Sequence, residues 1–214
     1  MAKVISILNL KGGSGKTTIA TNLAVAYATA GNKTLLIDTD KQESSLDWYG
    51  KRSEDLVKIN CISLSDSKAL KKQILDFCET YDTVIIDGAP QVDLMASISI
   101  MASDLIILPV APSPYDIWAT EGMVERIENA QAVDESIKAV FLINRDSSRT
   151  KISTDTKEAL QKFSLPLLET KIGNRIIYAD SAIAGESVLD DKSNPKATSE
   201  IDALYNETSN IFNN

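Results

Sequence analysis

The stretch that decides the fold reads Asn9-Leu10-Lys11-Gly12-Gly13-Ser14-Gly15-Lys16-Thr17-Thr18. It follows an apolar run that predicts a strand, Val4–Leu8, and it opens a segment with a helical pattern, Thr17–Ala30, which is followed by Gly31. A glycine-rich loop between a strand and a helix binds phosphate groups, because consecutive backbone N–H groups and the helix N-terminus point toward the anion. The sequence therefore predicts a site for a nucleoside triphosphate.

The loop contains the residue types that hold such a nucleotide. Lys16 lies at the helix N-terminus, where its ammonium and the neighbouring amides can surround phosphate oxygens, and the Thr17 hydroxyl is placed to bind Mg²⁺. The ordinary pattern G-x-x-x-x-G-K-[ST] would need glycine where this chain has Leu10, followed here by an additional lysine. A glycine turn that only caps the helix is the alternative interpretation. The residues expected to contact the nucleotide are Lys11, Gly12, Gly13, Ser14, Gly15, Lys16, Thr17 and Thr18.

Apolar runs rich in β-branched residues recur along the chain and alternate with helical patterns. The further predicted strands are Thr34–Ile37, Ile59–Leu64, Thr83–Ile86, Leu105–Val110 and Ala139–Ile143. The further predicted helices are Ser67–Tyr81, Ile117–Ala132, Ser153–Phe163 and Thr198–Phe212. Runs that barely alternate are typical of strands buried on both faces, so we predict an α/β fold with a mostly parallel sheet flanked by helices on both faces. Residues 1–214 are expected to form a single domain, with a polar loop at 190–196.

The composition limits which catalytic and metal-binding groups this protein can use. The 214 residues are 43% hydrophobic and 24% charged, as in globular domains, and 22 basic and 30 acidic side chains give a net charge of −8. The absence of histidine excludes a Ser/His/Asp triad and any metal site that uses histidine. Cys61 and Cys78 form no C-x-x-C pair and are expected to be core thiols. No signal peptide or membrane-spanning run is recognised, so we expect a cytoplasmic protein.

Two aspartates follow predicted strands on the side of the sheet that the loop occupies. Asp87 ends an apolar strand, where its carboxylate could bind Mg²⁺ opposite Thr17, and a turn residue is the alternative. Asp40 comes just after the second strand and would face the same crevice, because the carboxyl ends of parallel strands share one edge. There it could orient the attacking water. The predicted magnesium ligands are Thr17, Asp40 and Asp87.

These motifs resemble those of the ParA/MinD superfamily of deviant Walker A ATPases, whose signature is the additional lysine that Lys11 matches. The resemblance continues at Leu35–Gln42, where Lys41 stands in place of the family's proline, at the Walker B-like run Tyr81–Pro90, and at Pro109–Pro114 and Ala182–Val188. It implies a P-loop NTPase that hydrolyses ATP with Mg²⁺ and dimerises when ATP is bound. It also implies that Lys11 reaches toward the nucleotide of the second copy. By this resemblance the catalytic residues are Lys11, Lys16 and Asp40.

The resemblance also suggests where the adenine and DNA would bind. The family places an adenine pocket after the strand that matches Ala139–Ile143, so Asn144 and Arg145 are candidates, although a solvated loop cation is an equal alternative for the arginine. Residues 138–178 carry eight basic and four acidic side chains, a local excess of positive charge suited to nonspecific contact with DNA phosphates. Lys171 and Arg175 are the expected DNA contacts, because they flank a predicted glycine turn at 172–174. A scattered, solvated set of charges is the alternative.

Among the members of this superfamily, the chain most resembles the short, plasmid-type ParA (ParF-like) partition proteins. Its loop begins too early to leave room for an N-terminal helix-turn-helix domain, and the last eight residues contain no cation that could support a membrane-binding helix. The implied function is DNA segregation, in which the ATP-bound homodimer coats nonspecific DNA of the nucleoid and a ParB-type, centromere-binding partner triggers hydrolysis. Two alternatives remain: a related ATPase that positions a protein cargo, and an ATP-using small-molecule synthetase of the same superfamily.

Overall fold

The sheet that carries the site is parallel throughout. The computed structural model describes residues 2–90, 94–147 and 151–213. In these ranges the strands are β1 (Lys3–Ile7), β2 (Thr34–Asp38), β3 (Asn60–Ser63), β4 (Thr83–Asp87), β5 (Leu105–Val110), β6 (Lys138–Asp146) and β7 (Leu167–Gly173). They form one sheet in the order β3-β2-β4-β1-β5-β6-β7, and every adjacent pair is parallel.

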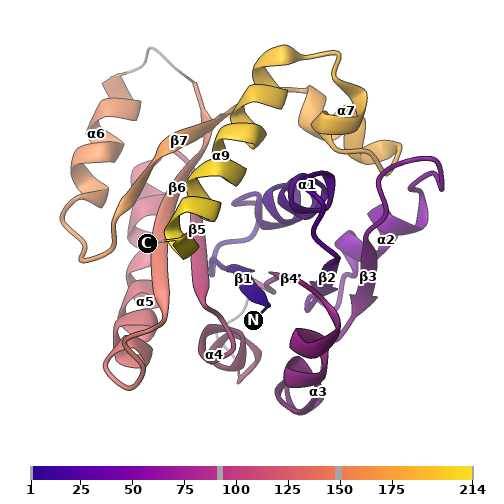
Figure 1. The fold of residues 1–214 in the computed structure, drawn as a ribbon. Coiled ribbons are helices and arrows are strands. Elements are labelled where there is room, and N and C mark those ends of the chain that lie inside the picture. The colour runs from indigo at the N-terminus through magenta and orange to yellow at the C-terminus, as the bar shows by residue number, and fades with distance from the viewer. Residues whose placement is uncertain (1, 91–93, 148–150, 214) are drawn as a thin grey trace.

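Helices cover both faces of this sheet, which confirms the predicted fold class. They are α1 (Lys16–Thr29), α2 (Ser44–Gly50), α3 (Ser67–Thr80), α4 (Leu94–Met101), α5 (Pro114–Gln131), α6 (Lys151–Leu160), α7 (Ile177–Ile183), α8 (Val188–Asp191) and α9 (Pro195–Asn213). Buried residues of α1, α8 and α9 pack on one face of the sheet, and those of α3, α4, α5 and α6 pack on the other. Figure 1 shows α1 and α9 above the sheet and α3 and α4 below it.

Helix α1 is enclosed on nearly every side. From Ile19 to Ala28 its side chains are buried, because the sheet lies beneath it and α9 packs over it. A helix that is apolar around its whole circumference is stable only in such a place. The loop before α1 is therefore attached to the most rigid part of the molecule.

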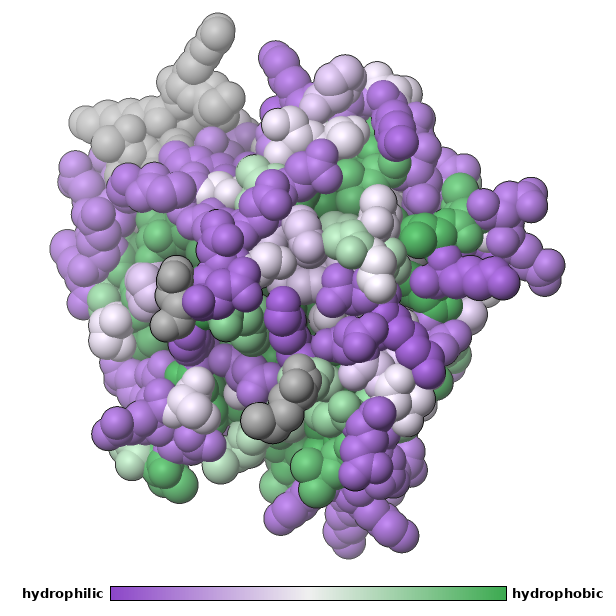
Figure 2. Space-filling view, in the orientation of Figure 1, coloured by the Kyte–Doolittle hydropathy of each residue, from purple (hydrophilic) through white to green (hydrophobic). Residues whose placement is uncertain are grey.

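Most of the outer surface is polar. Figure 2 shows hydrophilic residues over most of the face seen in Figure 1, with hydrophobic residues in small, separate patches. Within the described ranges, no helix is both long enough and apolar enough to cross a bilayer.

The sequence analysis did not predict strand β7, and the turn that it predicted at 172–174 is wrong. Ile172 and Gly173 belong to β7 and do not form a turn. This strand lies at the edge of the sheet, where only alternate side chains such as Leu168 and Ile172 reach the core, so it lacks the continuous apolar run of the central strands. The short helices α2, α4, α7 and α8 were also missed. The predicted loop at 190–196 is shorter than expected, because α8 ends at Asp191 and α9 begins at Pro195.

Carboxylates of α9 cover the outer edge of β7. The backbone N–H groups of Glu169 and Thr170 donate to the Glu207 carboxylate over 2.7 and 3.0 Å, and the Gly173 N–H donates to Glu200 over 3.1 Å. Glu200 and Glu207 are seven residues apart, so both project from the same face of the helix. The edge strand is thus hydrogen-bonded on both sides.

Candidate nucleotide-binding site

The phosphate loop connects β1 to α1 at the carboxyl edge of the sheet. Gly13 and Gly15 have φ angles of 74° and 95°, in the left-handed region that side-chain-bearing residues rarely adopt. A Cβ atom on Gly15 would lie 2.0 Å from Asn144 Nδ2. That amide donates to the carbonyl of Ser14 over 2.7 Å, so β6 fixes the loop from below. The loop is therefore preorganised by backbone conformation and by one buried amide.

Hydrogen-bond donors of the loop remain available to an anion. Helix α1 begins after Gly15 with no side-chain cap, so its first N–H groups are unsatisfied by any described side chain. The Ser14 hydroxyl is buried and lacks a partner among the described residues. Unpaired donors at a helix N-terminus fit a phosphate group, because the helix dipole also favours negative charge there.

Lys16 is buried within this loop. Its side chain is largely enclosed, and its ammonium donates to the carbonyl of Lys11 over 3.3 Å. Burial lowers the pKa of Lys16, while the charges of Asp87 and Asp40 act in the opposite direction. A cation held at the centre of a phosphate loop is the group that phosphoryl transfer requires.

A buried carboxylate lies directly beside the loop. Asp87 Oδ2 accepts hydrogen bonds from Thr17 Oγ1 over 2.7 Å and from Ser45 Oγ over 2.8 Å. Its other oxygen, Oδ1, is buried and has no hydrogen-bond partner in the described part of the chain. Burial raises the pKa of Asp87 to about 7, against the effect of the two hydroxyls. A free carboxylate oxygen beside a threonine hydroxyl fits Mg²⁺, which takes hard oxygen ligands.

Ser45 was missed by the sequence analysis. It lies in the first turn of α2, and its backbone N–H donates to Asp38 Oδ2 over 2.7 Å while its hydroxyl holds Asp87. Asp38 also accepts the N–H of Leu46 over 3.2 Å. Burial raises the pKa of Asp38, and its backbone hydrogen bonds counteract that rise. Asp38 thus fixes the start of α2.

Asp40 is placed between the loop and α2. Its carboxylate accepts the backbone N–H of Gln42 over 3.1 Å, and it is half-buried and close enough for its charge to act on Lys16. The structure brings Thr17 and Asp87 into direct contact, whereas Asp40 lies next to this pair without a described bond to it. Both roles expected of Asp40, orienting the attacking water and binding Mg²⁺, stay predictions.

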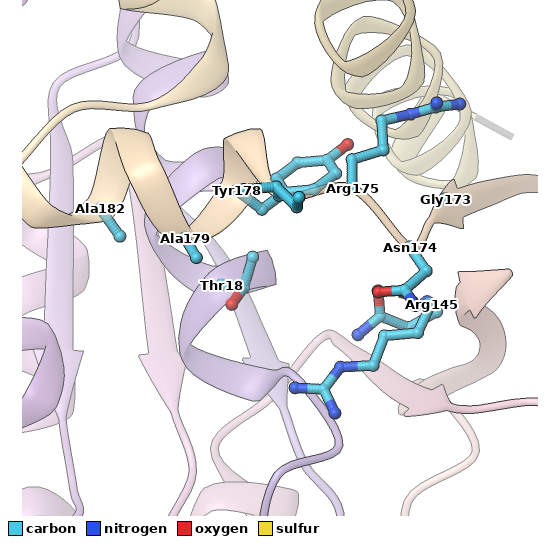
Figure 3. A pocket seen from close by; sticks show the side chains of 10 residues that line it. Thr18, Arg145, Gly173, Asn174, Arg175, Tyr178, Ala179 and Ala182 are labelled. Carbon is cyan, nitrogen blue, oxygen red and sulfur yellow. Dashed lines mark hydrogen bonds between the residues drawn. The ribbon is translucent and has the colours of Figure 1, made fainter. Parts of the chain in front are cut away.

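A cavity of about 410 Å³ opens beside the first turn of α1. Thr18 lies on one side of it and the ends of β6 and β7 on the other, and Figure 3 shows Arg145 and Asn174 together at its lower right. Its lining residues are Thr18, Asn144, Arg145, Gly173, Asn174, Arg175, Ile176, Tyr178, Ala179 and Ala182. The residues predicted to contact adenine therefore line one cavity with the loop helix, together with a β7–α7 segment that the sequence analysis did not include.

The backbone at Arg145 is strained. Its φ is 56°, in the left-handed region, and its N–H donates to the side chain of Asn144 over 2.9 Å. Strained non-glycine residues concentrate at functional sites. Asn144 and Arg145 lie within β6 rather than after it, where the register with β7 shifts between Ile143 and Asp146, and Asn144 faces the loop while Arg145 is exposed at the cavity.

Lys11 is held by α5. Its ammonium pairs with Asp116 in the first turn of that helix, and its backbone N–H donates to Asn9 Oδ1 over 2.9 Å. Leu10 packs against the same helix near Gly122, which accounts for an apolar residue where the ordinary pattern has glycine. The outer lip of the loop is therefore attached to α5.

Comparison with known proteins agrees with this geometry. The profile of the CobQ/CobB/MinD/ParA nucleotide binding domain matches residues 5–188. The chain belongs to this family. This match confirms the superfamily assignment, and the matched residues include the phosphate loop, Asp87 and the segment Ala182–Val188.

Two curated relatives and one solved structure illustrate its range. The "Maintenance of carboxysome distribution protein A" of Halothiobacillus neapolitanus is 29% identical over 211 residues, covering 96% of each chain. The "Sporulation initiation inhibitor protein Soj" of Bacillus subtilis is 26% identical over 234 residues, covering 88% of this chain and 91% of that protein. The septum site-determining protein MinD of Pyrococcus horikoshii, complexed with Mg-ADP, shares the fold with a TM-score of 0.77 and 22% identity, covering 97% of this chain and 96% of that one.

The segment Ala182–Val188, which the sequence analysis compared with a family motif, packs between α1 and the residues that follow α2. Gly185 has a φ of 72°, and a Cβ there would lie 2.5 Å from the backbone nitrogen of Arg52. Asn22 of α1 accepts hydrogen bonds from the hydroxyl of Ser187 and from the N–H of Val188, each over 3.0 Å. The motif thus joins α1 to the segment after α2, and no contact with nucleotide is needed to explain its glycine.

The two expected DNA contacts have different surroundings in this family member. Arg175 Nε lies 3.1 Å from Glu200 Oε1, so its guanidinium is paired with α9, and in Figure 3 the side chain extends away from Thr18 and Arg145. Lys171 is half-buried on the edge strand β7. The turn expected to present both cations is therefore wrong, and their role as DNA contacts stays a prediction. Of the basic region, Arg149 lies outside the described residues.

Proposed function

We propose that this protein is an ATPase that positions a cargo within the cell, acting as an ATP-dependent homodimer. The observation that carries the proposal is the contact between Thr17 and Asp87 beside a loop that contains both Lys11 and Lys16. Lys16 and the free N–H groups of α1 would hold the phosphates, and the cavity beside Thr18 would take the adenine.

Mg²⁺ would neutralise phosphate charge during transfer, and the residues available to hold it are Thr17 and Asp87. Ser45 keeps Asp87 Oδ2 in place, so that Oδ1 stays free for the cation. Asp40 would accept a hydrogen bond from the attacking water and orient it. Lys11 would act on the nucleotide of the second copy, since its side chain lies on the exposed lip of the loop.

The cargo is either DNA, with a ParB-type partner and nonspecific DNA as the track, or a protein assembly. The similarity to a carboxysome distribution protein over 96% of both chains favours the protein cargo. So does the pairing of Arg175 with Glu200, because it removes one of the two expected DNA contacts. A small-molecule synthetase would need a second polar substrate pocket, for which neither the sequence nor the site provides a specific observation.

Purified protein tests the core of this proposal. We expect Mg²⁺-dependent release of phosphate from ATP, loss of ATP binding in Lys16→Ala, and retained binding without dimerisation in Lys11→Ala. Nucleotide titration and light scattering measure both properties. A Lys11→Ala protein that dimerises normally with ATP would remove the second-copy role of this lysine, and absence of ATP binding in the parent would refute the proposal. Pull-down against a small DNA-binding partner or a protein assembly encoded nearby separates the two cargoes.

A further inference from the structure

The side chain of Lys11 is anchored at Asp116, a carboxylate outside the motifs named in the sequence analysis. Asp116 is only 7% exposed, whereas 37% of the Lys11 side chain is accessible to solvent. The anchor is therefore fixed within α5, and the lysine is the member of the pair that can move into solvent. Pairing with Asp116 holds the Lys11 ammonium at α5 of its own protomer, so Asp116 competes for this ammonium with a phosphate on another molecule.

The surroundings of Asp116 allow this pair to break without leaving an unsupported buried charge. Asp116 lies in the first turn of α5, after Ser113 as the N-cap, where the helix dipole stabilises a negative charge. The carboxylate thus keeps a favourable electrostatic partner when the lysine leaves. A buried carboxylate without such support would bind its lysine too tightly for reversible release.

Nucleotide binding would also affect Lys11, through its backbone carbonyl. Lys16 donates to the carbonyl of Lys11 over 3.3 Å, although Lys16 is the group expected to bind phosphate. A phosphate would compete with the Lys11 carbonyl for the Lys16 ammonium, and the other polar contacts that the described residues make with Lys11 are the Asn9 bond and the Asp116 pair. The contact with Asp116 then decides whether Lys11 is free.

We propose that Asp116 is a positioning residue that holds Lys11 against its own α5 and thereby sets how readily two ATP-bound copies associate. The inference rests on the proposed function, because it needs Lys11 to act across a dimer interface. Only the fraction of protomers with a released Lys11 is competent to associate, so the apparent association constant of the dimer scales with the square of that fraction. A symmetrical dimer uses two such lysines, and a threefold gain per protomer therefore tightens the dimer by about tenfold.

The test measures the dimer dissociation constant by analytical ultracentrifugation in a saturating concentration of a non-hydrolysable ATP analogue with Mg²⁺. Asp116→Asn removes the charge and keeps the shape, and Asp116→Ala removes both. The matched control is Glu125→Gln, which neutralises an exposed carboxylate on the same helix. We expect both Asp116 variants to dimerise about tenfold more tightly than the parent, and the control to match it.

A second comparison isolates the lysine. In a Lys11→Ala background, which we expect not to dimerise, Asp116→Asn should not restore association, because the residue that Asp116 restrains is gone. Asp116 variants that dimerise as the parent does or more weakly, while Lys11→Ala abolishes the dimer, would overturn this inference alone. A stabilising effect of Asp116→Asn that persists without Lys11 would also overturn it. A parent protein that stays monomeric with the analogue would refute the proposed function, and this inference with it.

Discussion

Gly15→Ala tests how tightly the phosphate loop is fitted to β6. The new Cβ would lie 2.0 Å from Asn144 Nδ2 and 3.3 Å from Asn144 Cγ, so the amide must move. Asn144 is 3% exposed, and its movement breaks the 2.7 Å bond to the Ser14 carbonyl in a place where water cannot easily replace it. The φ of 95° adds backbone strain, because a Cβ disfavours this region.

The two effects give the size of the loss. Left-handed backbone with a Cβ costs about 1–2 kcal/mol, and an unsatisfied buried polar group costs about 1–3 kcal/mol. We therefore expect Gly15→Ala to lower the free energy of unfolding by about 2–5 kcal/mol, and to weaken ATP binding because the loop carbonyl loses its anchor. Urea denaturation and nucleotide titration measure both quantities.

Gly12→Ala is the matched control, since a Cβ there meets nothing within 4 Å and its φ lies outside the left-handed region. Its unfolding free energy should remain within about 0.5 kcal/mol of the parent. Asn144→Ala completes a double-mutant cycle. Because the clash is absent in the double variant, its loss of unfolding free energy should be smaller than the sum of the two single losses by about 1 kcal/mol. A Gly15→Ala protein as stable as the parent would show that the loop does not depend on this contact.

Three further predictions concern the carboxylates and the charged surface. Asp40→Ala should bind ATP but lower turnover ~100-fold or more and so hold the dimer closed; phosphate release within about twofold of the parent would remove Asp40 from catalysis. Burial raises the pKa of Asp87 from 3.8 to about 7, so protonation of this carboxyl favours the folded state. The stability that this protonation contributes is fully present below pH 3.8 and is lost as the pH rises through about 7. The protein without Mg²⁺ and nucleotide should therefore be less stable toward urea at pH 8 than at pH 6, and an equal difference in Asp87→Asn would contradict this. Nonspecific DNA binding should require ATP, and Lys171→Ala, which removes one cation per subunit, should flatten the salt dependence of a dimer's log affinity by about two, whereas Arg175→Ala should change it less because Arg175 is paired with Glu200. Filter binding that is unchanged in the double alanine variant would place the DNA contact elsewhere.

Local patterns predicted the centre of the site well. The phosphate loop is one continuous stretch, and Asp87 ends an apolar run, so both could be found without knowledge of the tertiary structure. The central strands were found for the same reason, because burial on both faces leaves an uninterrupted apolar signal. The edge strand β7 has only half of that signal, and short helices such as α2 have too few turns to show a period.

Residues that join the site across the fold could not be found in this way. Asp116 pairs with Lys11 from 105 positions away, and Ser45 binds Asp87 from 42 positions away. No sequence periodicity predicts these separations along the chain, because they depend on the order of the strands in the sheet. The pairing of Arg175 with Glu200 is likewise set by the packing of α9 on β7. Charge counted along the chain indicated a basic region, but the partner that neutralises one of its cations lies in another element.

The covered edge of β7 bears on how copies of this protein can assemble. An open edge strand lets another chain extend the sheet by adding a strand, which is a common route to fibres. Here such an addition would first have to displace α9 and break the three hydrogen bonds that Glu200 and Glu207 accept from the β7 backbone. Bonds to carboxylates are among the stronger ones, so these contacts oppose strand addition at β7 in the folded protein. A filament of intact molecules would meet less resistance at helical faces, loops or the short strand β3 at the opposite edge.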